Sequence, residues 1–421
     1  MSPEAALTAH LLARLRRTVE FLGQAKTRIE AESRFAEVVD SMGFVEFLAL
    51  VADNCGVTVE AIEQAAGRRF GSVAQLAAAL HAAGLRIGEA ASARSAPVVE
   101  PPRQAHPGAW LAATAAGLPK QRQSASAINA LLHRPAGWLE NHAGIQARCL
   151  WDGEDALDAA ARTANDCLRQ AGLSSRMVSA LLVTSEAPPV LTGLAAAIHQ
   201  RLGFSAEVAA LEIGGACTGF LAAMWAARRL LADGGAVLVL AVEAPSLWLR
   251  IEPGPAGEAA SLFGDAAAAC VLTAQPSTAT ALPLRDIQLG TNGAVGSLLR
   301  VELEAGRGVA LHMDGPPLAQ RAVRTMADSI RQMSARHGLN VEQLAAVVAH
   351  GGNGRMPALL ARRLSLPVER VWSETANTGN LGSASLPVAW ANRTSPIHCP
   401  MIWTAVGAGL QWGAALFDGS G

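Results

Sequence analysis

The sequence predicts a layered α/β protein with a duplicated body, preceded by a small helical unit. Three observations support this prediction: helix and strand patterns alternate along the body, two of its segments share one plan, and a proline-rich stretch separates the units. The chain has 421 residues, of which 51% are hydrophobic and 16% are charged, so it can build a large buried core. Its 40 glycines suit close packing of helices on a sheet.

Two segments of the body follow the same plan. Residues 169–185 and residues 331–351 each lead from an Arg-Gln pair in a predicted helix, through Gly-Leu, to a β-rich run. The alanine of that run (Ala180 or Ala346) lies eight residues after the glycine in both segments. Chance similarity of two helix–strand units is the alternative, but the matched offsets favour a duplication. A pseudo-twofold body follows.

A segment without apolar periodicity, residues 88–107, separates the two units. Its prolines indicate a partly stiff linker. They are Pro97, Pro101, Pro102 and Pro107. We therefore expect one domain at residues 1–87 and a larger one at residues 108–421.

The first unit has helical patterning. Apolar residues recur at helical spacing over residues 5–23, and a last helix over residues 72–84 is closed by Gly84. Between them, a helix is predicted to start at Ser41. Taken alone, Asp40-Ser41 is an ordinary helix N-cap, because such side chains satisfy free backbone amides. The unit is predicted to be a small all-α bundle.

Charge and cysteine usage exclude several classes of protein. The net charge is −1 without a basic block, so no nucleic-acid partner is expected. The six cysteines are scattered without CxxC or zinc-ligand spacing, which predicts a reduced protein with no metal site. The N-terminus lacks a signal-peptide pattern, and no stretch is apolar enough to predict a membrane span. We expect a cytoplasmic protein that does not bind membranes.

The most informative segment surrounds Cys217. An apolar strand runs into Gly214-Gly215-Ala216-Cys217, and a helix follows. Glycines permit a sharp turn, and the helix dipole favours a thiolate at its N-terminus. A thiolate is the nucleophile that takes an acyl group from a thioester. The alternative is a buried structural cysteine, which is the better interpretation of the four others in the body: Cys149, Cys167, Cys270 and Cys399.

A condensing enzyme also needs donors for a developing oxyanion or enolate. A strand-like run ends at His350, and Asn380 lies between glycines ahead of a helical-looking segment. Neutral imidazole and carboxamide groups both donate hydrogen bonds to oxygen. A histidine at a strand end is usually a loop or capping residue. Paired with Cys217 from the other half of a duplicated fold, it becomes a candidate catalytic group.

With these residues in place, the chain from about Trp110 to its C-terminus resembles the β-ketoacyl-ACP synthase III group of the thiolase superfamily. Six motifs occur in the family's order: AGIQAR near residue 143, GGACTGF around Cys217, LFGDAAAA around Asp265, the His350 segment, GNLGSAS at Asn380, and the terminal GAGLQWGAAL. The resemblance implies a thiolase-like, duplicated five-layer α/β/α/β/α body.

The resemblance also implies roles for individual residues. Cys217 matches the acyl-accepting nucleophile, and His350 and Asn380 match the pair that stabilises the carbanion formed when a malonyl group loses carbon dioxide. The amides of Cys217 and Ala408 match the oxyanion hole. Trp138 matches an aromatic residue that stacks on the adenine of coenzyme A. Acyl-CoA or malonyl-thioester substrates and a homodimer are implied as well.

Departures from the family pattern affect primer choice and direct use of coenzyme A. The usual His-Gln-Ala-Asn is replaced by the segment His350-Gly351-Gly352-Asn353, and alanines replace glycines after Asp265. His142 stands where relatives have a basic coenzyme A contact. Leu191 stands where they have a phenylalanine that limits the acyl pocket. Glu186 is unusual in the same loop.

The first unit resembles an acyl carrier protein, in which an Asp-Ser-Leu motif receives phosphopantetheine on its serine. Here the motif is Asp40-Ser41-Met42, and Glu46 and Asp53 contribute an acidic surface. The resemblance implies covalent phosphopantetheine at Ser41.

Together these features predict an acyl-thioester condensing enzyme, an acyltransferase in the broad sense. An acyl group on Cys217 is joined to a malonyl-type extender by decarboxylative Claisen condensation, in polyketide or specialised fatty-acyl biosynthesis. The carrier domain supplies one partner, in cis or across a dimer, at a high effective concentration. Two alternatives stay open: acyl transfer from the carrier to a small-molecule hydroxyl or amine, and a non-catalytic acyl-carrier scaffold.

Overall fold

The computed structural model divides the chain into two compact units, Met1–Gln104 and Ala105–Gly421. The predicted linker, Ser41 and Leu191 lie outside the described residues, so the predicted domain boundaries stay predictions. The described residues are 2–21, 29–39, 43–44, 47–48, 51–52, 62, 71–84, 108–186, 193–231, 235–304, 308–313, 315–394 and 399–419.

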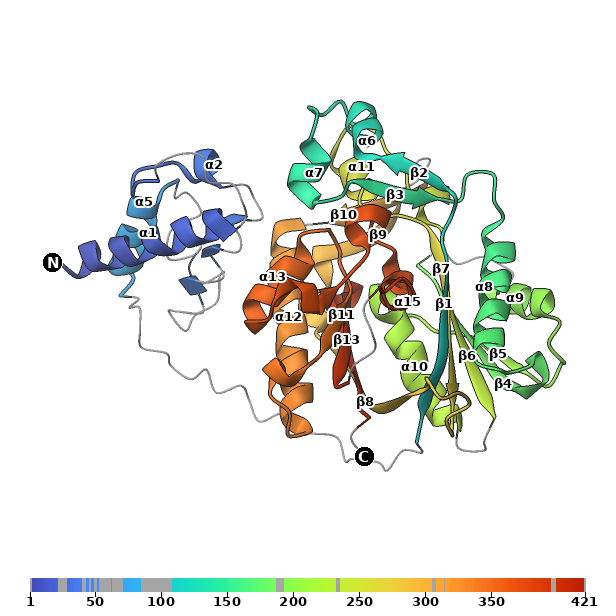
Figure 1. Ribbon diagram of the computed structural model, residues 1–421. Helices are drawn as coiled ribbons and strands as arrows, with labels where there is room; N and C mark the ends of the chain where they lie inside the picture. Colours follow the sequence, from blue (N-terminus) through green and yellow to red (C-terminus); the bar gives the residue numbers. More distant parts are fainter. Residues whose placement is uncertain are drawn as a thin grey trace. The chain divides into compact units, whose positions relative to one another are not determined.

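In the first unit, the described residues form helices around a small apolar core (Figure 1). Helix α1 (Pro3–Phe21) buries Leu7, Leu11 and Leu15, whose spacing of four places them on one face. That helix packs against α5 (Val73–Ala82), and a short helix, α2 (Phe35–Val38), contributes Phe35 to the same core. The predicted first and last helices of this unit are confirmed.

The second unit is built on one mixed sheet of ten strands, in the order β12-β11-β13-β14-β8-β1-β7-β6-β4-β5. Their bounds are β1 Trp110–Gly117, β4 Val178–Thr184, β5 Ala209–Glu212, β6 Ala236–Glu243, β7 Ala266–Thr273, β8 Leu282–Thr291, β11 Ala346–Ala349, β12 Val371–Trp372, β13 Met401–Gly407 and β14 Gln411–Phe417. Two small ribbons complete the strands, β2 (Gln121–Ser124) with β3 (Ala147–Leu150) and β9 (Leu299–Glu304) with β10 (Gly308–Met313).

The ten strands form two halves with the same topology. In the first half, β4 is parallel to β5 and β6, whereas β7 is antiparallel to both β6 and β1. In the second half, β11 is parallel to β12 and β13, whereas β14 is antiparallel to both β13 and β8. Antiparallel pairing of β1 with β8 joins the halves. The predicted duplication is confirmed by this repeated order.

The repeat extends to the helix–strand junctions that the sequence singles out. Helix α8 (Ala156–Gln170) is followed by Gly172 with φ of 67°, and α12 (Gly315–Arg336) by Gly338 with φ of 69°. In each case the next leucine amide donates back into the helix at 2.9 Å, from Leu173 in one half and from Leu339 in the other. A glycine after the last helical turn provides the left-handed conformation that such a cap requires.

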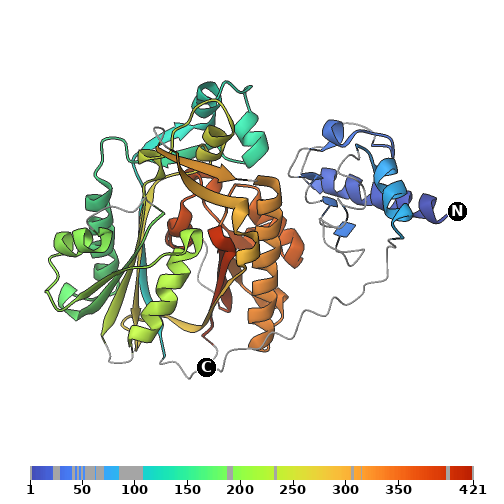
Figure 2. The same cartoon turned by 180° about the vertical axis from the view of Figure 1, so that it is seen from behind.

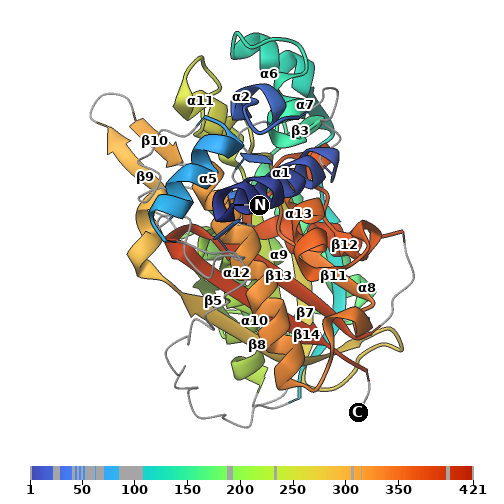
Figure 3. The same cartoon turned by 90° about the vertical axis from the view of Figure 1, so that its left-hand side faces the viewer.

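Helices lie on both outer faces of the folded sheet and between its halves (Figures 1 and 2). Helices α8 and α9 (Leu194–Leu202) cover the first half. Helix α12 lies along β13 and β14 of the second half, as Figure 3 shows. Helices α10 (Gly219–Leu230) and α15 (Ser385–Ala391) each contact strands of both halves. The order of layers is the α/β/α/β/α order that the family resemblance implies.

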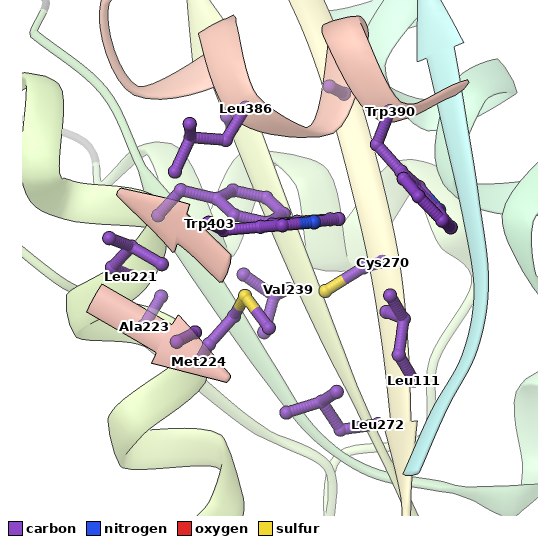
Figure 4. Close-up of a cluster of buried hydrophobic side chains, with 14 of the residues drawn as sticks. Leu111, Leu221, Ala223, Met224, Val239, Cys270, Leu272, Leu386, Trp390 and Trp403 are labelled. Atoms are coloured by element: carbon purple, nitrogen blue, oxygen red, sulfur yellow. The ribbon is translucent and has the colours of Figure 1, made fainter. Parts of the chain in front are cut away.

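The largest apolar cluster fills the middle layer (Figure 4). Trp403 of β13 is fully buried there among Leu221 and Met224 of α10 and Leu386 and Trp390 of α15. The two indole rings lie 5.8 Å apart between centroids. Side chains from both halves therefore share one core.

Short helices complete the second unit: α6 (Ala125–Leu131), α7 (Trp138–Ala143), α11 (Pro255–Ala260), α13 (Met356–Leu364) and α14 (Thr375–Thr378). Among the described residues, no helix is both long enough and apolar enough to span a bilayer.

Candidate active site

Cys217 lies in the turn that connects β5 to α10, as the sequence predicts. The turn is the short helix η2 (Ala216–Thr218), and Cys217 is 6% exposed. Gly215 has φ of 136°, and Ala216 has φ of 48°, a conformation that residues with a Cβ rarely adopt. The turn therefore needs a left-handed backbone at an alanine as well as at a glycine, which the sequence did not reveal. Strained backbone of this kind concentrates at functional sites.

The end of β13 approaches the backbone of Cys217 closely. A Cβ added to Gly407 would lie 3.0 Å from the amide nitrogen of Cys217 and 3.1 Å from that of Thr218. The short helix η9 (Ala408–Leu410) begins directly after this glycine. Ala408 and Cys217 thus belong to adjacent turns. Their joint use as an oxyanion hole stays a prediction.

His350 directly follows β11 and is buried, with 3% of its surface exposed. Its backbone amide donates to the carbonyl of Thr404 at 2.9 Å, which ties it to β13. Burial lowers the pKa of His350 from 6.5 to about 4, so the imidazole is neutral near pH 7. Its Nδ1 atom lies 3.3 Å from Oγ of Ser385, at the start of α15. A neutral imidazole oriented in this way can donate a hydrogen bond to a substrate oxygen.

Asn380 is buried in the loop before η8 (Gly382–Ala384). Its amide nitrogen donates to the carbonyl of Leu262 at 2.7 Å, and its carbonyl accepts from the amide of Gly264 at 2.9 Å. Its side-chain Oδ1 accepts a 2.9 Å hydrogen bond from the amide of Gly382. With Oδ1 engaged, the carboxamide offers Nδ2 as its donor.

Elements from both halves meet around these residues. The η2 turn that holds Cys217 packs against β13 and against η8, next to Asn380. A Cβ added to Gly219, the first residue of α10, would lie 3.6 Å from Cβ of Ser383. Cys217 comes from the first half, whereas His350 and Asn380 come from the second. Their cooperation in catalysis stays a prediction.

Two buried carboxyl groups stand beside Cys217, and the sequence did not indicate this. Glu243 ends β6 and accepts hydrogen bonds from the amide of Glu186 at 2.9 Å and from the amide of Ser383 at 3.1 Å. Burial, together with the charge of Glu186, raises the pKa of Glu243 well above its usual range. Burial also raises the pKa of Glu186. A charged residue at the end of an entirely apolar run was the available signal for Glu243.

The two carboxyl groups affect the pKa of the Cys217 thiol. From the helix dipole alone, the sequence predicts a stabilised thiolate at Cys217. Instead, burial first, and then the negative charges of Glu186 and Glu243, raise the pKa of Cys217 well above its ordinary value. This direction runs against the prediction of a preformed thiolate, because desolvation and nearby negative charge both disfavour the charged sulfur.

Asp265, the acid of the LFGDAAAA motif, is fully buried and satisfied. Its carboxylate accepts from the amide of Trp151 at 2.8 Å and from the amide of Ser246 at 3.0 Å. The preceding Gly264 binds the carbonyl of Asn380, and a Cβ there would lie 2.0 Å from the carbonyl oxygen of Thr378. The motif therefore positions the loop that carries Asn380.

Trp138 is the first residue of α7 and is half-buried against a small apolar cluster that includes Ile128 and Leu139. Its ring stacks on that of His142, with centroids 5.0 Å apart. The guanidinium of Arg134 lies 5.4 Å from the same ring. The Trp138 ring therefore lies next to an imidazole and a guanidinium, and its contact with adenine stays a prediction.

Comparison with protein families gives two matches. Residues 211–293 match the model of 3-oxoacyl-[acyl-carrier-protein (ACP)] synthase III, and residues 334–418 match its C-terminal model. The β-ketoacyl-[acyl-carrier-protein] synthase III of Pseudomonas aeruginosa PAO1 is 32% identical over 308 residues, which cover 70% of this chain and 92% of that protein. The synthase III of Oleidesulfovibrio alaskensis is 30% identical over 296 residues, covering 66% and 89%.

Solved structures agree with these matches. The crystal structure of 3-oxoacyl-(acyl carrier protein) synthase III from P. aeruginosa PAO1 has a TM-score of 0.68 and 29% identity, covering 74% of this chain and 98% of that one. The priming β-ketosynthase from the R1128 polyketide biosynthetic pathway has a TM-score of 0.66 and 25% identity, covering 76% and 99%. The chain belongs to the β-ketoacyl-[acyl-carrier-protein] synthase III family, and its second unit has the thiolase-like fold of a condensing enzyme.

Proposed function

We propose that this protein joins an acyl group held on Cys217 to a malonyl-type extender by decarboxylative Claisen condensation. The family supports a condensing reaction in general. The observation that carries the specific proposal is a pair of neutral donors from the second half, a neutral His350 and an Asn380 whose Oδ1 is already engaged, with the Cys217 turn packed against η8 next to Asn380. Simple acyl transfer produces no carbanion and needs no such pair.

Different residues act in the two steps of the proposed reaction, acyl loading and condensation. In acyl loading, Sγ of Cys217 attacks the thioester carbon, and the amides of Cys217 and Ala408 stabilise the oxyanion. In condensation, His350 and Asn380 donate to the enolate oxygen that develops as the malonyl group loses carbon dioxide. The resulting carbanion attacks the acyl carbon and releases Cys217.

The first unit is proposed to be an acyl carrier domain modified at Ser41. Phosphopantetheine there supplies a thiol for thioester formation when bound. Tethering such a carrier to the synthase raises the effective concentration of its acyl group. The pathway that we propose is therefore polyketide or specialised fatty-acyl biosynthesis. Trp138 is proposed to contact coenzyme A where the acyl donor is acyl-CoA.

A homodimer is proposed as well. Strand β5 is the last strand at its end of the sheet, and its Leu211 is 47% exposed. An exposed edge strand with apolar side chains is suited to pairing with a second copy. A lysine at this position, Leu211→Lys, is expected to shift the protein toward monomer in sedimentation velocity.

Intact-mass spectrometry of the full chain tests the proposal. The protein is treated with a phosphopantetheinyl transferase, then with acetyl-, butyryl- or octanoyl-CoA and malonyl thioester, while carbon dioxide release is followed. We expect acyl mass on Cys217, phosphopantetheine mass on Ser41, and malonyl-dependent release of carbon dioxide. Asn380→Ala is expected to lower that release at least 100-fold while acyl loading persists.

Control variants separate the alternatives. Cys217→Ala should abolish loading, whereas Cys270→Ala, a buried cysteine of β7, should leave it intact. Acyl transfer to a hydroxyl or amine without loss of carbon dioxide would favour the acyltransferase alternative. Absence of acyl mass on Cys217 with every donor would favour the carrier scaffold.

A further inference from the structure

Glu186 is placed beside Cys217 in a way that structural needs do not explain. It follows β4 by two residues, and its carboxyl group interacts with the Cys217 side chain. The residue as a whole is partly accessible, but its Oε1 atom is buried and has no hydrogen-bond partner among the described residues. A buried carboxyl oxygen without a partner is destabilising, so its retention beside a nucleophile indicates a chemical role.

The fold makes room for this carboxyl group. A Cβ added to Gly382 would lie 2.7 Å from Oε1 and 2.9 Å from Cδ of Glu186, and 3.1 Å from Cδ of Glu243. Gly382 also has φ of 52° and binds Oδ1 of Asn380. The loop that orients Asn380 therefore also seats both carboxyl groups. Their position is set by the core of the site and not by a surface loop.

Glu243 and Glu186 differ in the hydrogen bonds that their carboxyl groups accept. Glu243 accepts from the amide and hydroxyl of Ser383 and from the amide of Glu186, so its carboxylate is held in place. Oε1 of Glu186 has no such contact in the part of the chain that the structure describes. Glu243 is therefore a positioning residue, whereas Glu186 is available to gain a proton.

Cys217 needs a proton acceptor. Because its pKa is raised, the thiol keeps its proton until a thioester arrives. His350 is a weak base, since burial lowers its pKa to about 4. Among the described residues, the ionisable groups that act on the thiol are Glu186 and Glu243. Burial raises the pKa of the Glu186 carboxyl, which makes its carboxylate a stronger base than an exposed one.

We propose that Glu186 is a catalytic residue that accepts the Cys217 thiol proton during acyl loading and returns it to the departing thiol. This inference rests on the proposed acylation of Cys217. As Sγ forms its bond to the thioester carbon, the S–H bond breaks and the proton moves to a Glu186 carboxylate oxygen. When the tetrahedral intermediate collapses, the bond from carbon to the donor sulfur breaks, and that sulfur takes the proton from Glu186. The products are acyl-Cys217 and a free thiol, and nothing is oxidised or reduced.

Single-turnover acylation measures the step directly. The probe is whichever of acetyl-, butyryl- and octanoyl-CoA loads the wild-type chain, with acyl-Cys217 followed by quench and mass spectrometry across pH 5–9. Glu186→Gln is expected to slow loading about 100- to 10,000-fold, the usual contribution of a general base. It should also remove the acidic limb of the pH profile, since a carboxylate is no longer required. Glu186→Asp should recover part of the rate.

A second measurement separates proton transfer from electrostatics. Removing a negative charge beside Cys217 lowers the pKa of the thiol, so iodoacetamide should alkylate Cys217 faster in Glu186→Gln at neutral pH. Slower loading together with faster alkylation supports the proposal. If both rates rise, Glu186 acts only through its charge, and the proposal is overturned.

Matched controls complete the design. Glu212→Gln changes another glutamate at a strand end, on β5, and should load at the wild-type rate. Thermal unfolding shows whether each variant is folded. Carbon dioxide release that depends on Asn380 shows whether the decarboxylation site of the variant is intact. If Glu186→Gln does not fold, a loading pH profile in Glu186→Asp that keeps the wild-type acidic limb unshifted would equally overturn the proposal. Failure of the wild-type chain to load at all would instead contradict the proposed function.

Discussion

The amide of Glu186 donates a 2.9 Å hydrogen bond to Oε2 of Glu243, so the ends of two neighbouring parallel strands are joined beside the nucleophile. Both carboxyl groups are raised in pKa by burial. Together they give Cys217 acidic surroundings. They mean that the resting nucleophile is a thiol.

Gly382 lies against the carboxyl groups of Glu186 and Glu243, and we expect a side chain there to destabilise the protein. Gly382→Ala should lower the free energy of unfolding by about 1–3 kcal/mol more than Gly338→Ala, because the added methyl group meets both carboxyl groups. Gly338 is the matched control, since it also has a positive φ, of 69°, but no neighbouring atom within 4 Å. Denaturant titration measures both. Equal losses would show that backbone conformation alone sets the cost.

Ser385 is expected to orient His350 for the condensation step. Ser385→Ala removes the 3.3 Å contact with Nδ1, so the tautomer that donates from the other ring nitrogen is no longer favoured. Carbon dioxide release should fall about 10-fold, whereas loading of Cys217 should be unchanged. Ser385→Thr, which keeps the hydroxyl, should restore the rate.

A matched control for this serine is Ser334→Ala. Ser334 is also buried, and its hydroxyl has no hydrogen-bond partner among the described residues. This variant should retain full decarboxylation. A loss of activity common to both serine variants would point to packing and not to histidine orientation.

His350 is expected to make the fold sensitive to acid. Its pKa is about 4 when folded and 6.5 when exposed, so the unfolded chain binds more protons between these values. Stability therefore falls as the pH drops below 6.5, by about 2 kcal/mol at pH 5 from this residue alone. His350→Gln should remove that part of the pH dependence in denaturant titrations.

The buried acids change the pH dependence of stability in the opposite direction. They are present in both the wild type and His350→Gln, so the effect of His350 is the difference between these two proteins. His81→Gln changes an exposed histidine of α5 and serves as the control. An identical pH dependence for wild type and His350→Gln would contradict the assignment of a neutral, buried imidazole.

Trp403 is expected to dominate the stability of the middle layer. Trp403→Ala should cost about 3–5 kcal/mol, because a fully buried ring is lost and a cavity remains. Trp403→Phe should cost less than half as much, since the Nε1 donor of Trp403 is buried without a partner among the described residues. Denaturant titration of both variants checks this order, and a larger loss for phenylalanine would show that the indole nitrogen has an acceptor.

The fold was predictable because its signals are local and repeated. Gly172 and Gly338 mark the same helix end in each half, and the apolar runs after them are strands. Cys217 was predictable for a similar reason, since a glycine-rich turn between a strand and a helix is a recognisable position for a nucleophile.

The electrostatic surroundings of that nucleophile were not predictable. Glu186 and Glu243 are separated by more than fifty residues, and they meet only because β4 and β6 are neighbours in the sheet. The positive φ of Ala216 has no sequence signal either. Both features depend on packing between distant segments, which a pattern of residue types does not record.

The joint between the two halves has a consequence for how the enzyme tolerates change. Only two residue pairs, Trp110 with Pro283 and Leu111 with Leu282, join β1 to β8. The alignment of nucleophile and donors across that joint is held by the contacts of η2 with β13 and η8 and by the side chains of α10 and α15, which pack against strands of both halves. Substitutions of buried side chains in α10 and α15, far from any reacting atom, could therefore change the turnover rate during evolution while every catalytic group stays the same.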